Sequence, residues 1–222
     1  PIFIGMYYSF TDWDGIGNQA NWVGLQNYIE IFTQDEGFLH AFAFTTIFAI
    51  VSVFIINIIG FGLALLVTKE MKGNNFLRGI FFMPNLIGGL ILGFIWQFIF
   101  IKAFDWIGAQ LGVSALQGWL STTMTGFWGL VILMSWQLSG YMMVIYISAL
   151  QGIPESLKEA AAIDGANYLQ RLRHIIIPLV APAFTVGIFL SLSNAFKLFD
   201  QNLALTNGGP YNSTQMLALN IY

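Results

Sequence analysis

The chain has 222 residues, of which 57% are hydrophobic and only 9% are charged, with a formal net charge of −3. A soluble domain carries roughly 25% charged residues, so this composition predicts a protein that is largely solvated by lipid. No basic stripe indicates nucleic acid binding, and the absence of cysteine excludes disulfides and thiolate metal sites. The two histidines, His40 and His174, lack metal-ligand spacing, so we predict no metal site.

Four uncharged apolar runs are long enough to cross a bilayer, which needs about 20 helical residues. They cover about 41–68, 79–101, 126–150 and 175–196. Shorter apolar segments stand at the two ends, 1–10 and 215–222, and we expect each to be part of a truncated terminal span. Pro84 and the pair Gly88-Gly89 predict a kink or a close helix contact in the second run. No run alternates as a strand would, so we predict an all-α membrane protein, a multi-span helical bundle forming a single domain over 1–222.

Lys and Arg are distributed unevenly among the connections between these runs. The 69–78 and 151–174 connections contain Lys69, Lys72, Arg78, Lys158, Arg171 and Arg173, whereas the connections on the other side keep Lys102 and Lys197. Cytoplasmic loops carry an excess of Lys and Arg, so we predict that the 69–78 and 151–174 connections are cytoplasmic. The connections 11–37, 102–125 and 197–214 then face outward.

The charged stretch 151–174, between the third and fourth runs, has the signals of two short helices joined by a turn. Pro154 suits the first helical position, and Glu155 complements the helix dipole in the first turn. Asp164-Gly165 marks a turn, where Gly165 can take the positive φ that ends a helix. A second short helix is predicted over Ala166–His174, running into the fourth run.

The first of these helices combines small apolar residues with charges that could fix the register of a partner protein. The apolar members are Leu157, Ala160, Ala161 and Ile163, and the charged ones are Glu155, Lys158, Glu159 and Asp164. Small side chains allow another backbone to approach closely, so the surface is suited to docking. The alternative is a polar loop that only connects two membrane helices.

The same residues resemble the EAA motif of the membrane subunits of binding-protein-dependent ABC importers. The match consists of Glu159-Ala160-Ala161, Asp164-Gly165-Ala166, Ile175, Pro178 and Pro182, with the spacing intact. Further stretches are similar to the carbohydrate-type permease branch, namely SFTD at 9–12, VGLQNY at 23–28, Phe196–Asp200, LTNGGP at 205–210 and Asn212–Thr214. The resemblance extends over essentially the whole chain.

This resemblance implies a type I ABC permease core of about six spans in the plasma (inner) membrane of a prokaryote. It implies coupling helices that sit in a groove of a cytoplasmic ATPase dimer, formed by Glu155, Glu159, Ala160, Ala161, Asp164, Gly165 and Ala166. It also implies a second, related permease subunit and an extracytoplasmic solute-binding protein. The chain has no G-x-x-x-x-G-K-[ST] motif, so ATP and Mg²⁺ are expected on the ATPase, and this chain is expected to bind no cofactor and to be no enzyme.

Polar residues within the runs are uncharged, which suits the hydroxyl groups of a sugar. The resemblance places a sugar site near mid-membrane, and the candidate substrate-binding residues are Gln137, Tyr141, Ser191 and Asn194. Tyr141 falls where such permeases can present an aromatic ring to a sugar. For each polar residue the alternative role is hydrogen bonding between helices.

We therefore predict a subunit that translocates a mono-, di- or oligosaccharide inward in an ATP-driven importer. A permease for glycerol phosphate, phosphate or a polyamine is one alternative, and a stand-alone channel or secondary carrier is another. An anion would favour buried Arg or Lys, and a polyamine or a proton-coupled carrier would favour buried carboxylates, but the four runs contain neither. No His–Ser pair or paired carboxylates in a span indicate catalysis.

Overall fold

The computed structural model describes residues 2–17, 20–68 and 73–222, and it consists of helices joined by loops. Within these residues there is no β-sheet, and extended segments pair only between Thr11 and Trp22. Four helices are long and apolar enough to cross a membrane: Glu36–Val67, Gly89–Leu111, Thr123–Gln151 and Tyr168–Phe196. The predicted all-α, multi-span fold is confirmed.

The N-terminal part places two short helices, α1 (Ile2–Tyr8) and α2 (Gln26–Thr33), before the first long helix, α3 (Glu36–Val67). In the loop between them, the carboxylate of Asp12 accepts hydrogen bonds from the side chain and the backbone N–H of Asn21, which lower the pKa of Asp12. The α3 helix starts at an N-cap, where Asp35 Oδ1 accepts from the Phe38 N–H at 2.9 Å.

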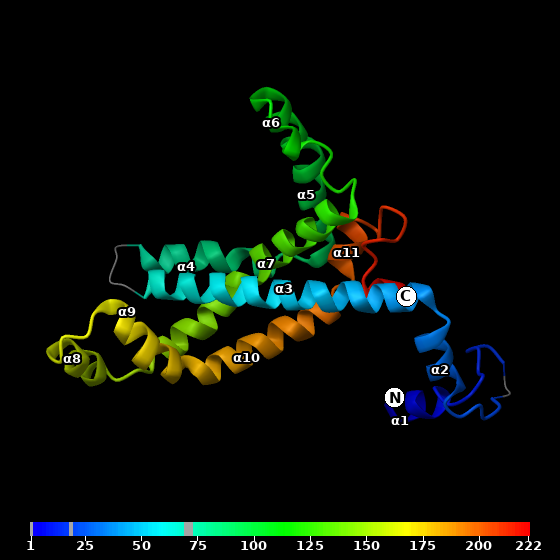
Figure 1. Ribbon diagram of the computed structural model, residues 1–222, viewed down its shortest axis with the longest axis horizontal. Coiled ribbons are helices and arrows are strands. Elements are labelled where there is room, and N and C mark those ends of the chain that lie inside the picture. Colours follow the sequence, from blue (N-terminus) through cyan, green and yellow to red (C-terminus); the bar gives the residue numbers. More distant parts are fainter. Residues whose placement is uncertain (1, 18–19, 69–72) are drawn as a thin grey trace.

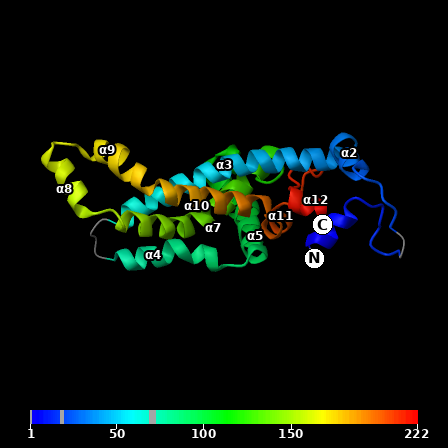
Figure 2. The same ribbon diagram turned by 90° about the horizontal axis from the view of Figure 1, so that it is seen from below.

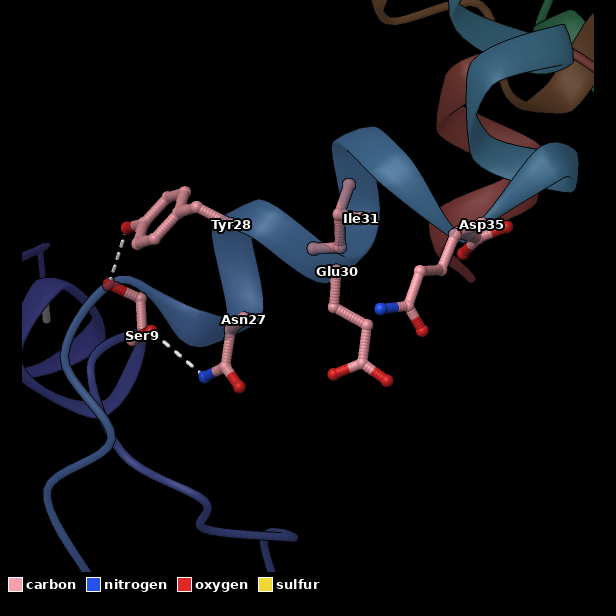
Figure 3. Close-up of a pocket in the computed structure, with 7 residues that line it drawn as sticks. Ser9, Asn27, Tyr28, Glu30, Ile31 and Asp35 are labelled. Carbon is pink, nitrogen blue, oxygen red and sulfur yellow. Dashed lines mark hydrogen bonds between the residues drawn. The ribbon is translucent and has the colours of Figure 1, made fainter.

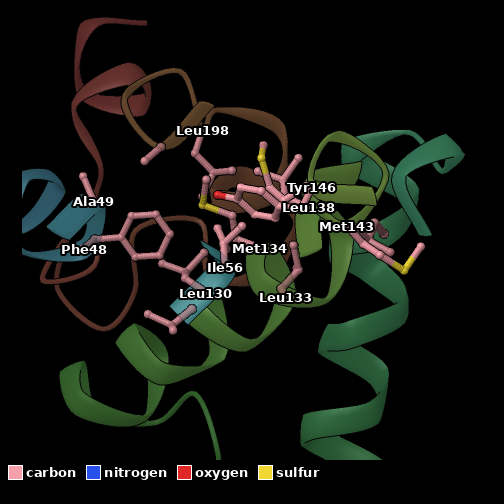
Figure 4. Packing of buried hydrophobic residues seen from close by; sticks show 14 of the residues in the cluster. Phe48, Ala49, Ile56, Leu130, Leu133, Met134, Leu138, Met143, Tyr146 and Leu198 are labelled. Atoms are coloured by element: carbon pink, nitrogen blue, oxygen red, sulfur yellow. The ribbon is translucent and has the colours of Figure 1, made fainter. Parts of the chain in front are cut away.

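The centre of the bundle is α7 (Thr123–Gln151), which passes between α3 and α4 (Figures 1 and 2). Thr122 and Thr125 close its N-terminus as a reciprocal capping box. In an apolar 18-residue stretch of α7, 67% of the residues are buried. The corresponding stretches have 39% buried in α3 and 17% buried in Tyr168–Phe196. Figure 4 shows why: side chains of α7 meet those of α3 and of the chain after α10, including Phe48, Ile56, Leu130, Leu133, Met134, Leu138 and Leu198.

The prediction that 79–101 forms one span is wrong. The chain forms α4 (Asn74–Phe82), then the 3-10 turn η1 (Met83–Leu86), and a new helix, α5, starts only at Gly89. Pro84 has no N–H to continue a helical ladder, and Ile87 and Gly88 are extended, with ψ of 130° and 143°. The sequence predicted a kink or a close helix contact at Pro84 and Gly88-Gly89, and the structure has a full break there, so the apolar run belongs to two separate helices.

After the break, α5 (Gly89–Phe98), the π-helical η2 (Ile99–Ala103) and α6 (Phe104–Leu111) form one continuous rod that projects from the bundle (Figure 1). The predicted outer connection 102–125 is correspondingly shorter. It begins near Gly112 and contains the short 3-10 helix η3 (Ser114–Leu116). The base of the rod packs on α11 (Asp200–Leu205).

Before the break, α4 runs back along α7. Gly140 of α7 permits this contact, because a Cβ at this position would overlap the backbone carbonyl of Phe81. From the middle of α4, Arg78 Nη2 donates to Val67 O at 3.1 Å. A cation is thereby placed at the C-terminus of α3, where it complements the helix dipole.

The remaining elements are α8 (Glu155–Ile163), α9 (Tyr168–Arg171), the π-helical η4 (Leu172–Ile176), α10 (Ile177–Phe196) and α12 (Leu217–Ile221). Both views place α8, α9 and the start of α4 at one end of the bundle, and α2 and α12 at the other (Figures 1 and 2). The two connections predicted to be cytoplasmic thus share an end. Lys69 and Lys72, which contribute to that prediction, lie outside the described residues.

Candidate functional site

The segment 151–174, which is predicted to form the coupling helices and is called the coupling loop below, contains α8. Pro154, predicted at the first helical position, is instead the N-cap residue, and the helix begins one residue later at Glu155. Lys158 Nζ lies 2.8 Å from Glu155 Oε2 across one turn. This exposed ion pair links the two side chains but adds little stability, because water screens it.

A Schellman motif ends α8 at the predicted turn. Gly165 has a φ of +76°, as predicted. Its N–H donates to Ala162 O at 3.1 Å, and the Ala166 N–H donates to Ala161 O at 2.9 Å. These two bonds satisfy carbonyls that the helix end would otherwise leave unpaired. The sequence Asp164-Gly165-Ala166 thus fixes the angle at which the chain leaves α8.

The next helix starts later than predicted. It begins at Tyr168 instead of Ala166 and continues without a break through η4 into α10, so residues 168–174 are already part of the last long helix. The cause is a capping box: Asn167 Oδ1 accepts from the Gln170 N–H at 2.9 Å, and Gln170 Oε1 accepts from the Asn167 N–H at 2.8 Å. A movement at α9 is therefore passed directly to α10.

The outer surface of the coupling loop combines exposed apolar and acidic groups. Ile163 is 86% exposed and Leu169 is 69% exposed, and Glu159 and Ala160 are exposed beside them. Ala161, predicted to lie on the docking surface, is instead buried on the inner side of α8. Between the turn and α9 lies an open cavity of about 320 Å³, lined by Asp164, Gly165, Ala166, Gln170, Arg171, His174 and Ile175. Sequence reasoning missed Leu169, because its exposure depends on where α9 starts.

The predicted substrate residues lie in different surroundings. Gln137 is buried in α7, where its Nε2 donates to Ile87 O at 3.3 Å and its Oε1 accepts from Gln201 Nε2 at 2.9 Å. Tyr141, one turn further along the same helix, is half-buried and packs against the core. These two residues share a face of α7, as their spacing predicts.

The other two predicted residues, on α10, do not share one environment. Ser191 is fully buried, and its Oγ donates to Gly187 O at 2.6 Å and accepts from Asn57 Nδ2 at 3.0 Å. Asn194 is exposed and donates to Leu190 O at 2.8 Å. Ser191 thus donates within α10 and accepts one hydrogen bond from Asn57 on α3, and this interhelical bond is the alternative role that its sequence position left open.

Two larger cavities lie elsewhere and contain none of the four predicted substrate residues. One, of about 630 Å³, opens between α3, α4 and α7, and its wall is almost entirely apolar, including Trp96, Trp128 and Trp136. The other, of about 680 Å³, is open to solvent beside α2 (Figure 3). There Ser9 Oγ lies 2.7 Å from Tyr28 Oη, Asn27 Nδ2 donates to Ser9 O, and the carboxylates of Glu30 and Asp35 lie further along the same side.

Comparison with known proteins places this arrangement in a family. The family described as "Binding-protein-dependent transport system inner membrane component" matches residues 57–222. The chain is 55% identical, over 100% of its length and 75% of the relative, to the probable starch degradation products transport system permease protein AmyD of Thermoanaerobacterium thermosulfurigenes. It is 32% identical, over 100% of its length and 77% of the relative, to the multiple sugar-binding transport system permease protein MsmF of Streptococcus mutans.

A further relative has a different named solute, and a solved structure shares the fold. The chain is 32% identical, over 100% of its length and 76% of the relative, to the sn-glycerol-3-phosphate transport system permease protein UgpA of Yersinia pestis. A bacterial ABC transporter involved in the import of the acidic polysaccharide alginate superposes with a TM-score of 0.82 at 20% identity, over 100% of this chain and 76% of that chain. The chain is a multi-pass membrane protein, and it belongs to the family of binding-protein-dependent transport system inner membrane components.

Proposed function

We propose that this chain is the membrane-spanning permease subunit of an ATP-driven importer that moves a saccharide inward across the plasma membrane. The observation that carries the proposal is the coupling loop. Its Schellman turn at Gly165 fixes α8, and α9 continues directly into α10. A protein that pulls on this loop therefore moves α7 and α10, which flank it.

The partner at the coupling loop is an ATPase subunit that binds ATP and Mg²⁺. Exposed Ile163 and Leu169 supply apolar contact area, and exposed Glu159 can fix the register. The helices of this chain serve as the translocation path, and a second permease completes that path. This chain itself catalyses no reaction.

At the opposite end of the bundle, an external binding protein delivers the solute. A solved structure supports this part of the proposal. It is a bacterial alginate ABC transporter in complex with a periplasmic protein bound to an alginate pentasaccharide, and this chain matches it with a TM-score of 0.76 at 19% identity. The cavity beside α2 offers hydroxyl, amide and carboxylate groups to such a partner. Its Tyr28 is a side chain of the type that anchors protein interfaces.

A saccharide is favoured by the relatives named for starch products and multiple sugars, and by the polar groups of the spans. Glycerol 3-phosphate remains the second candidate because of UgpA. An anion inside the membrane requires cationic partners, but the sequences of α3, α7 and α10 contain no Lys or Arg, and Lys102 in the fourth long helix, Gly89–Leu111, is exposed. Neutral amides and aromatic rings instead suit the hydroxyls and C–H faces of a sugar.

The test is uptake by proteoliposomes that contain the complex of this chain, the ATPase, the second permease and the binding protein. Maltose, trehalose, longer malto-oligosaccharides, glycerol 3-phosphate and spermidine are supplied in turn, with ATP or a non-hydrolysable analogue. We expect uptake of at least one saccharide with ATP and none with the analogue. Uptake of glycerol 3-phosphate or spermidine alone, or uptake that does not need ATP hydrolysis, would overturn the proposal.

A further inference from the structure

Two glutamine side chains meet at the centre of the most buried helix. Gln137 is at the midpoint of the 29-residue α7, so about 21 Å of helix separates it from either end. Its Oε1 accepts from Gln201 Nε2 at 2.9 Å. This hydrogen bond ties the start of α11 to the middle of a membrane helix. A buried amide there needs such partners, because hydrocarbon offers none.

The third member of this chain of hydrogen bonds is a backbone carbonyl freed by the helix break. Ile87 is extended, so its C=O is not part of a helical ladder, and it accepts from Gln137 Nε2 at 3.3 Å. Irregular backbone at membrane depth is found where it is covered by protein or lines a solute path. The break at Ile87 and the amide of Gln137 therefore form a polar point on the wall of the bundle.

Close packing holds Gln201 in position. Gly89, the first residue of α5, lies against it, because a Cβ there would be 3.0 Å from Gln201 Cδ and 2.8 Å from Asp200 Cβ. The α11 helix, the base of α5 and the middle of α7 are thus joined at one place. Within the described residues Gln201 Oε1 accepts no hydrogen bond, so this amide retains capacity for a ligand.

We propose that the Gln201–Gln137 hydrogen bond is a latch that holds α11 against α7, and that sugar hydroxyls replace it during transport. Gln201 is then a positioning and sugar-binding residue that sequence reasoning missed. The proposal rests on the proposed function and extends it, because it names how the solute and the opening of the path are coupled.

The chemistry of the exchange follows from the groups present. A sugar hydroxyl both donates and accepts, so one hydroxyl can accept from Gln201 Nε2 and donate to Gln137 Oε1. Both amides then remain hydrogen-bonded when α11 separates from α7. Without sugar the same separation leaves them unpaired in the middle of the membrane, which is costly. Opening is therefore favoured only when the sugar is present.

The test is ATP hydrolysis by the reconstituted complex without sugar and without binding protein. Gln201→Leu removes the latch and should raise this basal rate about two- to tenfold, because the closed arrangement loses one buried hydrogen bond. Gln201→Asn keeps the amide on a shorter side chain that cannot reach Gln137, so it should raise the basal rate as well. It replaces the leucine variant in the test if that variant is not produced. In both variants the concentration of sugar-loaded binding protein needed for half-maximal transport should also rise.

The matched control is Gln97→Leu. Gln97 Nε2 donates to Leu205 O at 3.1 Å, so this change also removes an amide contact to α11 but none to α7. We expect a wild-type basal rate. Wild-type rates in both Gln201 variants, or an equal rise in Gln97→Leu, would overturn the latch. The measurement contains no sugar, so its outcome is independent of which solute the uptake panel identifies.

Discussion

The phenolic hydroxyl of Tyr146 on α7 donates to Asn57 Oδ1 on α3, inside the bundle. The same amide donates through Nδ2 to Ser191 Oγ on α10 at 3.0 Å, so one side chain joins three helices. All three residues are buried. Because α7 and α10 flank the coupling loop, this cluster holds together the two helices that would transmit its movement.

Tyr146→Phe should reduce the stability of the protein by about 1 kcal/mol. The change keeps the ring but leaves Asn57 Oδ1 without its donor, and hydrogen bonds between membrane helices contribute on average about 0.6 kcal/mol and at most about 1.7 kcal/mol. Thermal unfolding of the purified complex in detergent measures the effect. Tyr141→Phe is the matched control, because the hydroxyl of Tyr141 makes no hydrogen bond within the described residues. Equal melting temperatures for the two variants would contradict the prediction.

The coupling loop shows how much local sequence can determine. Gly165 lies directly after a short helix, and only a residue that tolerates positive φ can close a Schellman motif there. The turn was therefore predictable from neighbouring residues alone. The start of α9 was predicted wrongly although its signal is also local, because Asn167 is a far better N-cap residue than Ala166 or Gly165, and Gln170 three residues later completes a capping box.

The interior shows what sequence could not determine. The apolar content of 79–101 indicates compatibility with lipid, and Pro84 with Gly88-Gly89 indicates a kink, but neither shows that the helix ends before Ile87 and that a separate helix begins at Gly89. Likewise, helical spacing places Gln137 and Tyr141 on one face but does not say what faces them. The partner of Gln137 is Gln201, 64 residues away in a stretch that reads as a turn-rich connection. Only the packing of α11 brings them together.

Tyr141→Ala should weaken transport, because we propose that its ring stacks on the sugar. Loss of an aromatic contact of about 1–3 kcal/mol corresponds to an increase of about 5- to 150-fold in the sugar concentration for half-maximal transport. Assembly of the complex should be retained. Ile132→Ala is the control, since Ile132 also packs against the core but lines the apolar cavity on another face of α7. If both variants lose transport equally, Tyr141 has only a packing role.

Single cysteines should report the orientation of the chain, which has no cysteine of its own. Ser156 and Asn207 are both exposed and lie at opposite ends of the bundle. A membrane-impermeant thiol reagent should label Ser156→Cys only when it has access to the cytoplasmic side, and Asn207→Cys only from outside. The Lys and Arg excess is the reason for this expectation. The reverse labelling pattern would show that the assigned orientation is wrong.

Glu159→Lys should separate the ATPase from this chain without affecting membrane insertion. Glu159 is exposed on α8, and reversing its charge places a like charge against a surface that is complementary to an acid, which costs several kcal/mol at a close interface. Co-purification with the ATPase should fall at least tenfold, while the level of the chain in the membrane stays normal. Glu30→Lys makes the same reversal on α2, at the other end of the bundle, and should leave co-purification unchanged.

Gly165→Val should disconnect the coupling loop from the ATPase by changing the angle between α8 and α9. The φ of Gly165 is +76°, and a Cβ in this region costs roughly 1–2 kcal/mol, with β-branching narrowing the options further. The chain relieves this strain by leaving the Schellman geometry, so Glu159 on α8 and Leu169 on α9 no longer face the partner together. We expect normal membrane levels, loss of sugar uptake and weak co-purification with the ATPase.

Gly112→Val is the matched control, because Gly112 ends α6 with a φ of +67° and suffers the same backbone strain away from the coupling loop. Equal loss of co-purification in both variants would mean that general instability is the cause. If Gly165→Val transports at the wild-type rate, the loop is only a connector.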